Sequence, residues 1–127
     1  MNVPDDLLYT ESHEWIKREG DNIRVGITDH AQAELTDVVY VELPKADRAV
    51  NAKEAIAVVE SAKAASEVYA PVTGEIVAVN DTLSSQPGKV NAAAMGDGWF
   101  FKIKPAAPAN DLMDESQYQT YIKGLDS

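Results

Sequence analysis

Residues 55–80 read AIAVVESAKAASEVYAPVTGEIVAVN, a pattern that predicts three consecutive short strands. The apolar, β-branched runs cover residues 55–61, 66–72 and 75–80, and small or turn-forming residues separate them. The connection between the first two strands contains Lys63, with alanines on both sides. The sequence therefore places this lysine at the tip of a hairpin, where its small neighbours leave it accessible to another protein.

Upstream of this stretch, the pattern predicts a hairpin, a short helix and a further strand. Residues 9–16 and 23–28 form the expected hairpin, with a polar turn at residues 20–22. Residues 28–35 predict a helix of about two turns, capped by the threonine or the aspartate at its start. Residues 38–44 begin with an apolar, β-branched run, which predicts a strand buried on both faces and closed by its final proline.

Downstream, one more strand and a C-terminal helix are expected. Residues 45–54 are polar and turn-like, and residues 81–98 are rich in Ser, Pro, Gly and Asn, which predicts an extended surface loop. The aromatic and β-branched residues 99–105 predict the strand. The helix is expected over about residues 115–123, after a capping box at residues 114–117.

Composition supports one mainly β domain that spans residues 1–127. The chain has 127 residues, of which 45% are hydrophobic, enough for one compact core and too few for two ordinary domains. Its net charge of -10 argues against a nucleic-acid partner, because phosphate backbones are bound by clustered Lys and Arg. With no cysteine, the chain has no disulfide, no thiolate nucleophile and no Cys-ligated metal of its own.

Neither a membrane span nor a targeting segment is expected. No apolar run approaches the roughly 18 residues of a spanning helix, and the N-terminus is acidic. We expect a monomeric cytoplasmic protein, although the same features fit a mature mitochondrial form.

A survey of reactive side chains predicts neither a catalytic site nor a metal site. His13 and His30 are too far apart for a helical metal pair. Ser12, His13 and Glu14 resemble a triad, but neighbours on a strand point to opposite faces and cannot meet. No carboxylate lies in an apolar context expected to raise its pKa. Judged by its local surroundings alone, Lys63 is an ordinary solvated turn residue.

Several separated motifs together resemble one known family, the glycine cleavage H proteins. They include YTESHEW from residue 9, VGITDHAQAELTDVVYVELP from residue 25, ESAKA around Lys63, APVTGEIVAVN from residue 70 and GDGWFFKIKP ending at residue 105. The resemblance covers most of the chain in one order. It implies a barrel-sandwich hybrid of two packed small sheets, the lipoyl and biotinyl type, with short peripheral helices and a C-terminal helix.

The resemblance also implies a function. Lys63 would be the covalent attachment point of (R)-lipoate, held as lipoyl-lysine, and Glu60 and Gly74 would help lipoate-attaching enzymes to recognise the chain. Ser12, Glu14 and Glu67 match polar positions near the cleft that receives the loaded arm.

The chain would then be a carrier without catalytic activity, working with three enzymes. The pyridoxal-phosphate P protein (glycine decarboxylase) loads an aminomethyl group, the tetrahydrofolate-dependent T protein (aminomethyltransferase) removes it, and the L protein (dihydrolipoyl dehydrogenase) reoxidises the arm.

Other functions remain open alternatives. A biotinyl carrier usually shows Met-Lys-Met, and a lipoyl domain of a 2-oxo acid dehydrogenase usually shows Asp-Lys-Ala, whereas this chain has Ala-Lys-Ala. A different class is a noncatalytic interaction module that keeps the fold without using the lysine; another is a relay that passes lipoate to other proteins. An enzyme is the least supported reading.

Overall fold

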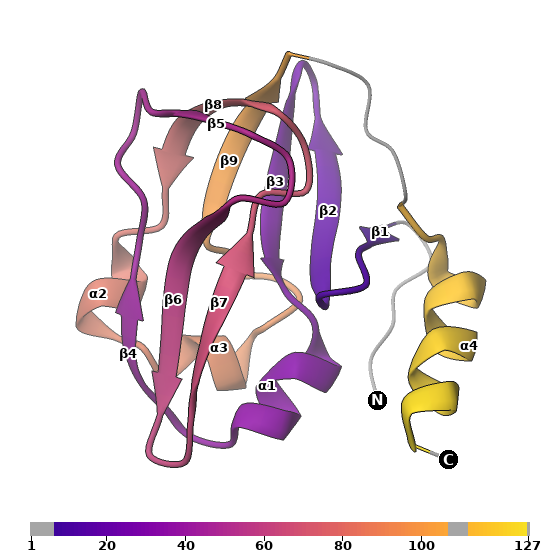
Figure 1. Ribbon diagram of the computed structural model, residues 1–127. Coiled ribbons are helices and arrows are strands. Elements are labelled where there is room, and N and C mark those ends of the chain that lie inside the picture. Colours follow the sequence, from indigo (N-terminus) through magenta and orange to yellow (C-terminus); the bar gives the residue numbers. More distant parts are fainter. Residues whose placement is uncertain (1–6, 107–111, 127) are drawn as a thin grey trace.

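The computed structural model of the chain describes residues 7–106 and 112–126 (Figure 1). In chain order the elements are β1 Leu8–Tyr9, β2 Glu14–Glu19, β3 Asn22–Ile27, α1 Asp29–Leu35, β4 Val38–Glu42, β5 Ala49–Val50, β6 Ala55–Ser61, β7 Ala65–Tyr69, β8 Gly74–Val79, α2 Thr82–Ser85, α3 Lys89–Ala92, β9 Phe101–Pro105 and α4 Glu115–Asp126.

The strands form two antiparallel sheets. The larger has the order β1-β2-β3-β9-β8-β5, and the smaller has the order β4-β6-β7. Figure 1 shows the two sheets packed against each other, with α1 near the turn that joins β6 to β7. The predicted fold class, mainly β with two packed small sheets, peripheral helices and a C-terminal helix, is confirmed.

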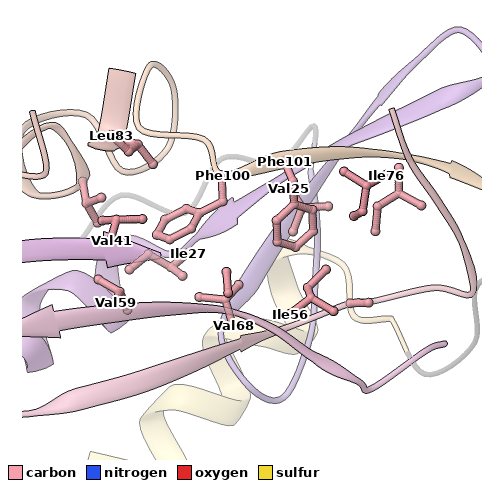
Figure 2. Close-up of a cluster of buried hydrophobic side chains, with 14 of the residues drawn as sticks. Val25, Ile27, Val41, Ile56, Val59, Val68, Ile76, Leu83, Phe100 and Phe101 are labelled. Atoms are coloured by element: carbon pink, nitrogen blue, oxygen red, sulfur yellow. The ribbon is translucent and has the colours of Figure 1, made fainter. Parts of the chain in front are cut away.

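The main core lies between the two sheets (Figure 2). Val25, Ile76 and Phe101 of the larger sheet and Val59 and Val68 of the smaller one are all at most 1% exposed. Because successive strand residues point to opposite faces, the β-branched residues along each strand fill one side of each sheet. Burial of this apolar surface is the main force that holds the sheets together.

A second, smaller cluster lies under α4. Adjacent β2 residues divide between the two clusters: Ile16 points into the main core and Trp15 into the second one. The indole N–H of Trp15 donates to the carbonyl of Ala94 at 2.7 Å, and the ring lies over Gly26, where a Cβ would come within 2.7 Å of it. Tyr118 of α4 stacks on Tyr9, with ring centroids 4.6 Å apart.

Both expected hairpins are present, and so are the predicted helix caps. Strands β2 and β3 pair from Glu14–Ile27 to Glu19–Asn22, and β6 pairs with β7. Thr28 caps α1 by accepting from Ala31 N at 3.2 Å. At the start of α4, Gln117 N donates to the Asp114 carboxylate and Asp114 N donates to the Gln117 side chain, the reciprocal pair of a capping box.

The expectation that residues 38–44 are buried on both faces is wrong. Val38 and Val41 of β4 are buried, but Val39 and Tyr40 are exposed. The reason is that β4 is an edge strand whose pairing with β6 is shifted by a bulge between Val38 and Tyr40.

Two segments expected to be irregular contain regular elements. Residues 45–54 include β5, which pairs with β8 at the edge of the larger sheet. Residues 81–98 include the single-turn helices α2 and α3, so the prediction of an extended surface loop is wrong. Leu83 and Val90, one on each helix, are fully buried and anchor this segment to the core.

The first predicted strand is interrupted. Only β1 and the start of β2 are extended, and residues 10–13 form a turn in which His13 has a φ of 68°. Within this turn Glu14 N donates to Thr10 Oγ1 at 3.0 Å and His13 N donates to Thr10 O at 3.1 Å. The polar side chains of this turn therefore do not alternate as they would on a strand.

Candidate functional site

Lys63 lies at the tip of the β6–β7 hairpin, in the three-residue connection between the strands. Lys63 and the flanking Ala62 and Ala64 are all exposed. The Lys63 Nζ lies 3.4 Å from the carbonyl oxygen of Glu34 in α1, a long and exposed hydrogen bond. The amine is therefore within reach of a protein that approaches the tip.

The hydroxyl of Ser61 holds this tip in shape. Its Oγ accepts from Lys63 N at 3.2 Å and from Ala64 N at 3.0 Å, and it lies 3.2 Å from Ala64 O. Ser61 N also donates to Ala64 O at 2.8 Å. Serine side chains commonly bond to nearby backbone in turns, so one buried serine orders the backbone on which the lysine stands.

A cleft of about 300 Å³ begins beside the tip, between α1 and β7. Ala64, the neighbour of Lys63, lines it, as do Glu34 and His30 of α1 and Glu67 of β7. Because the Lys63 amine contacts Glu34, its side chain lies at the mouth of this cleft. A chain attached to the amine could therefore lie either in solvent or along the cleft.

A larger hollow of about 620 Å³ lies on the other side of the residue 10–14 turn. Its lining includes Glu14, Tyr69, Lys53 and Tyr121, and Ser12 lines both this hollow and the cleft beside the tip. The turn thus forms the boundary between the two hollows.

Glu14 is a buried carboxylate at the floor of the larger hollow, 1% exposed. One oxygen accepts from Thr10 Oγ1 at 2.5 Å and from Ser12 Oγ at 2.7 Å, and the other accepts from Tyr69 N at 3.3 Å. All three donors are neutral. Burial raises the pKa of Glu14, and these hydrogen bonds offset part of that rise. The expectation that no carboxylate lies in surroundings that raise its pKa is therefore wrong.

The structure brings together only part of the predicted cleft set. Ser12 and Glu14 are hydrogen-bonded, and Ser12 and Glu67 line the same cleft. Glu14 and Glu67, however, line different hollows. Ser12 does not meet His13, as expected, but the reason is the turn: Ser12 Oγ donates to Glu14 while His13 contacts α4.

A network of His13, His30, Thr28 and Tyr118 lies beside these hollows, and the sequence survey did not find it. The Tyr118 hydroxyl lies 2.8 Å from His13 Nδ1 and 2.7 Å from Thr28 Oγ1. The two histidine rings are in contact, with centroids 4.7 Å apart. Burial and the neighbouring His30 lower the pKa of His13. Burial raises the pKa of Tyr118 to about 12, so its hydroxyl remains protonated at neutral pH.

This network ties α4 to the turn that carries Ser12 and Glu14. Nδ1 of a neutral His13 ring can accept a hydrogen bond from the Tyr118 hydroxyl, and the Thr28 hydroxyl can then donate to the Tyr118 oxygen. Tyr121 adds a bond from its hydroxyl to Glu11 O at 3.1 Å. Residues about 90 to 110 positions apart meet here, so no local sequence pattern could have revealed the network.

Replacing Tyr118 with phenylalanine is expected to lower the free energy of unfolding by about 1–2 kcal/mol, because it removes a buried hydroxyl with two partners. The matched control is Tyr121→Phe, which removes an exposed bond and should cost less than about 0.5 kcal/mol. Urea unfolding of both variants measures the difference. Equal losses would show that the network does not hold α4.

Glu60 and Gly74 lie in different sheets. Glu60 is half-buried near the end of β6, opposite Tyr40 of β4 and Ala65 of β7. Gly74 is buried at the start of β8, where a Cβ would come within 2.2 Å of the Lys104 carbonyl oxygen. The packing of β8 against β9 therefore requires a glycine at position 74, whether or not another protein also recognises this residue.

Within the part of the chain that the structure describes, no helix is long and apolar enough to cross a membrane.

Comparison with known proteins gives one consistent family. Residues 7–125 match the family described as Glycine cleavage H-protein. The chain is 50% identical over 125 residues to the glycine cleavage system H protein of Methylacidiphilum infernorum, covering 97% of this chain and 98% of that protein. It is 56% identical over 116 residues to the corresponding protein of Bradyrhizobium diazoefficiens, covering 90% of this chain and 95% of that one.

A solved structure agrees. The crystal structure of a glycine cleavage system H protein from Mycobacterium marinum superposes with a TM-score of 0.88 at 35% identity, covering 98% of this chain and 100% of that chain.

Proposed function

The chain belongs to the glycine cleavage H-protein family, and on that premise we propose that Lys63 carries a lipoyl group through an amide bond to its side-chain nitrogen. The observation that supports this most directly is the exposed lysine at the hairpin tip, at the mouth of a cleft. A lysine amine becomes a nucleophile once it is neutral, and an exposed tip can be offered to an activated acyl donor.

The surroundings of Lys63 fit such a group. The flanking alanines leave room for an enzyme, and the cleft beside the tip offers an apolar wall from residues such as Ala65, Val68 and Leu35. A lipoyl group supplies reversible thiol and disulfide chemistry that a cysteine-free chain lacks. The chain's own contribution is to present, orient and shelter the carried group.

We further propose that this chain serves three enzymes of the glycine cleavage system. It would receive an aminomethyl group from the P protein, deliver it to the tetrahydrofolate-dependent T protein, and present the reduced arm to the L protein. A single exposed attachment point on a small, acidic domain suits a carrier that must visit several active sites in turn.

Ser12, Glu14 and Glu67 are proposed to shelter the carried aminomethyl group. Its protonated nitrogen would donate a charge-assisted hydrogen bond to a carboxylate, and the hollows would keep water away from it. The carboxylate of Glu14 is suited to this because its hydrogen-bond donors are neutral and leave its charge uncompensated.

Replacing Glu14 and Glu67 together with glutamine is expected to speed hydrolysis of the carried group about tenfold, the value of one charge-assisted hydrogen bond. The single variants identify which hollow is used, and Glu75→Gln is the exposed control with the same loss of charge. Ammonia release from the loaded protein measures the rate. The pKa of Glu14 is raised, so on acidification its carboxylate becomes protonated at a higher pH than that of an ordinary glutamate. The protection of the carried group by Glu14 should be lost at that same higher pH. An unchanged rate in all variants would contradict the shelter.

The function itself is tested by lipoylation. The purified protein is incubated with a lipoate ligase, lipoate and ATP, and intact mass and peptide mapping then locate any adduct. One lipoyl amide on Lys63, followed by glycine decarboxylation with P protein, is the expected result. No adduct alongside a working control H protein would favour the noncatalytic interaction module instead.

A further inference from the structure

Two large apolar side chains stand exposed next to the proposed modification site. Among the described residues, Val39 at 57% and Tyr40 at 49% are the exposed large hydrophobics. Both lie in β4, at the bulge where pairing with β6 shifts. Side chains of this size usually find cover in a folded protein, and an exposed aromatic beside a functional residue is a typical anchor of a protein interface.

The strand register puts Tyr40 in the outward-facing row nearest the tip, next to the pair Val38 and Ser61, whose side chains are buried. Tyr40 is paired with Glu60, and Glu60 is paired with Ala65 of β7, so the three side chains share the outer face of the smaller sheet. Glu60 precedes Lys63 by three residues, so the Cα atoms of the two residues lie at most about 10 Å apart.

The bulge is held firmly in place. Val38 N donates to Asn91 Oδ1 at 2.8 Å, and Asn91 Nδ2 donates to Thr36 O at 2.7 Å and to Gln32 Oε1 at 3.0 Å. Asn91 of α3 therefore joins the end of α1 to the start of β4. The apolar pair is presented by a rigid support, which lowers the entropic cost of binding.

The part of this face nearest the tip carries mainly carboxylates, whereas Lys45 and Arg48 lie at its far end, in a hollow that they line together with Glu42 and Glu67. On the outer face Glu60 is paired with Tyr40, and Glu42 and Glu67 lie in the next row, where both are paired with Val58. Lys63 is the only Lys or Arg between residues 54 and 88, and none occurs between residues 25 and 44. Acylation of Lys63 would remove that single positive charge from the hairpin. A partner that docks on Tyr40 and covers the tip is therefore expected to carry basic groups opposite Glu60 and the carboxylates of the next row.

We propose that Val39 and Tyr40, rimmed by Glu42, Glu60 and Glu67, are the docking surface for the enzyme that acylates Lys63, and that this enzyme presents an apolar depression bordered by Lys or Arg. The inference rests on the proposed function, since it takes Lys63 as the modified residue. An enzyme that forms a bond to Nζ must cover the tip itself. A typical interface buries about 800 Å² on each partner, so its contact also covers the neighbouring row. Enzymes that act on the far end of a long arm need not come so close.

The test compares kcat/KM for lipoylation of the full-length chain by a lipoate ligase, followed by intact mass. Tyr40→Ser is expected to lower kcat/KM about tenfold, mainly by raising KM, and Val39→Ser to lower it less. Tyr40→Phe, which keeps the ring, should match the unchanged protein. The combined Glu42→Gln and Glu67→Gln variant should weaken the salt dependence of KM, whereas Glu75→Gln should not.

A second arm separates docking from the reactivity of the amine. Acetylation of Lys63 by an N-hydroxysuccinimide ester needs no protein partner, so Tyr40→Ser should leave its rate unchanged. A parallel loss of rate in this reaction would overturn the docking surface, and so would an unchanged ligase kcat/KM in Tyr40→Ser and Val39→Ser.

Thermal unfolding checks that each variant is folded, and Tyr40→Gln replaces the serine variant if that variant is unstable. If the unchanged protein takes no lipoate, the proposed function fails; if it is lipoylated on Lys63 and the variants behave like it, only the docking surface fails.

Discussion

Replacing Lys63 with arginine is expected to abolish lipoylation while leaving the fold unchanged. Arginine keeps the positive charge and much of the length of the side chain, but its guanidinium stays protonated and cannot attack an acyl donor. Lys63 is exposed, and its side chain makes one long hydrogen bond, so the free energy of unfolding should change by less than about 0.5 kcal/mol. Intact mass after incubation with ligase, lipoate and ATP measures the first effect, and urea unfolding measures the second.

The control for this variant is Lys104→Arg, an equally conservative change at an exposed lysine of the larger sheet. It should accept one lipoyl group as the unchanged protein does. In a reconstituted system with P protein, glycine decarboxylation should fall to background with Lys63→Arg and remain normal with the control. A lipoyl adduct on the Lys63→Arg protein would place the attachment point elsewhere and refute the proposed function of this residue.

Replacing Gly74 with alanine is expected to cost about 3 kcal/mol of stability, because the new methyl group has no space. A Cβ there would lie 2.2 Å from the Lys104 carbonyl oxygen and 2.9 Å from Ile103 Cγ2, both in the paired strand β9. Backbone cannot move aside as a flexible side chain can, so β8 and β9 must separate locally. For a chain of this size the unfolding temperature should fall by about 10 °C, which calorimetry measures.

Gly88→Ala is the matched control, since a Cβ at that position meets nothing within 4 Å and its unfolding temperature should hardly change. The same pair of variants also separates two roles for Gly74. If lipoate-attaching enzymes read this residue directly, Gly74→Ala should lose lipoylation even at temperatures where it remains folded. If its role is packing alone, the folded fraction should be lipoylated at the normal rate. A Gly74→Ala protein as stable as the control would contradict the packing argument.

Local patterns predicted the elements whose determinants are close together in the chain. The alternating apolar residues on either side of Lys63 predicted β6 and β7, and the capping box predicted the start of α4. Both signals act over a few residues, through strand alternation or a side chain that satisfies nearby backbone. The family motifs supplied the proposed function, since an exposed turn lysine has no chemical signature of its own.

Errors arose where burial depends on distant neighbours. The apolar run at the start of β4 looked like a doubly buried strand, yet its edge position and bulge leave Val39 and Tyr40 exposed. The polar stretch after Asn80 looked like a loop, yet Leu83 and Val90 reach the core and support two short helices. In each case the burial of the side chains depends on which distant segments pack against them. A local stretch of sequence does not contain that information.

By itself the sequence determined most of the longer strands, the helices α1 and α4, the hairpin that carries Lys63 and the acidic, cysteine-free composition of the chain, because these follow from local spacing and composition. Only the tertiary structure buried Glu14 and raised its pKa, brought Tyr118 to His13 and Thr28, and placed Tyr40 in the row beside the tip. The reason is physical: desolvation, long-range hydrogen bonds and strand register exist only once segments far apart in the chain have packed together.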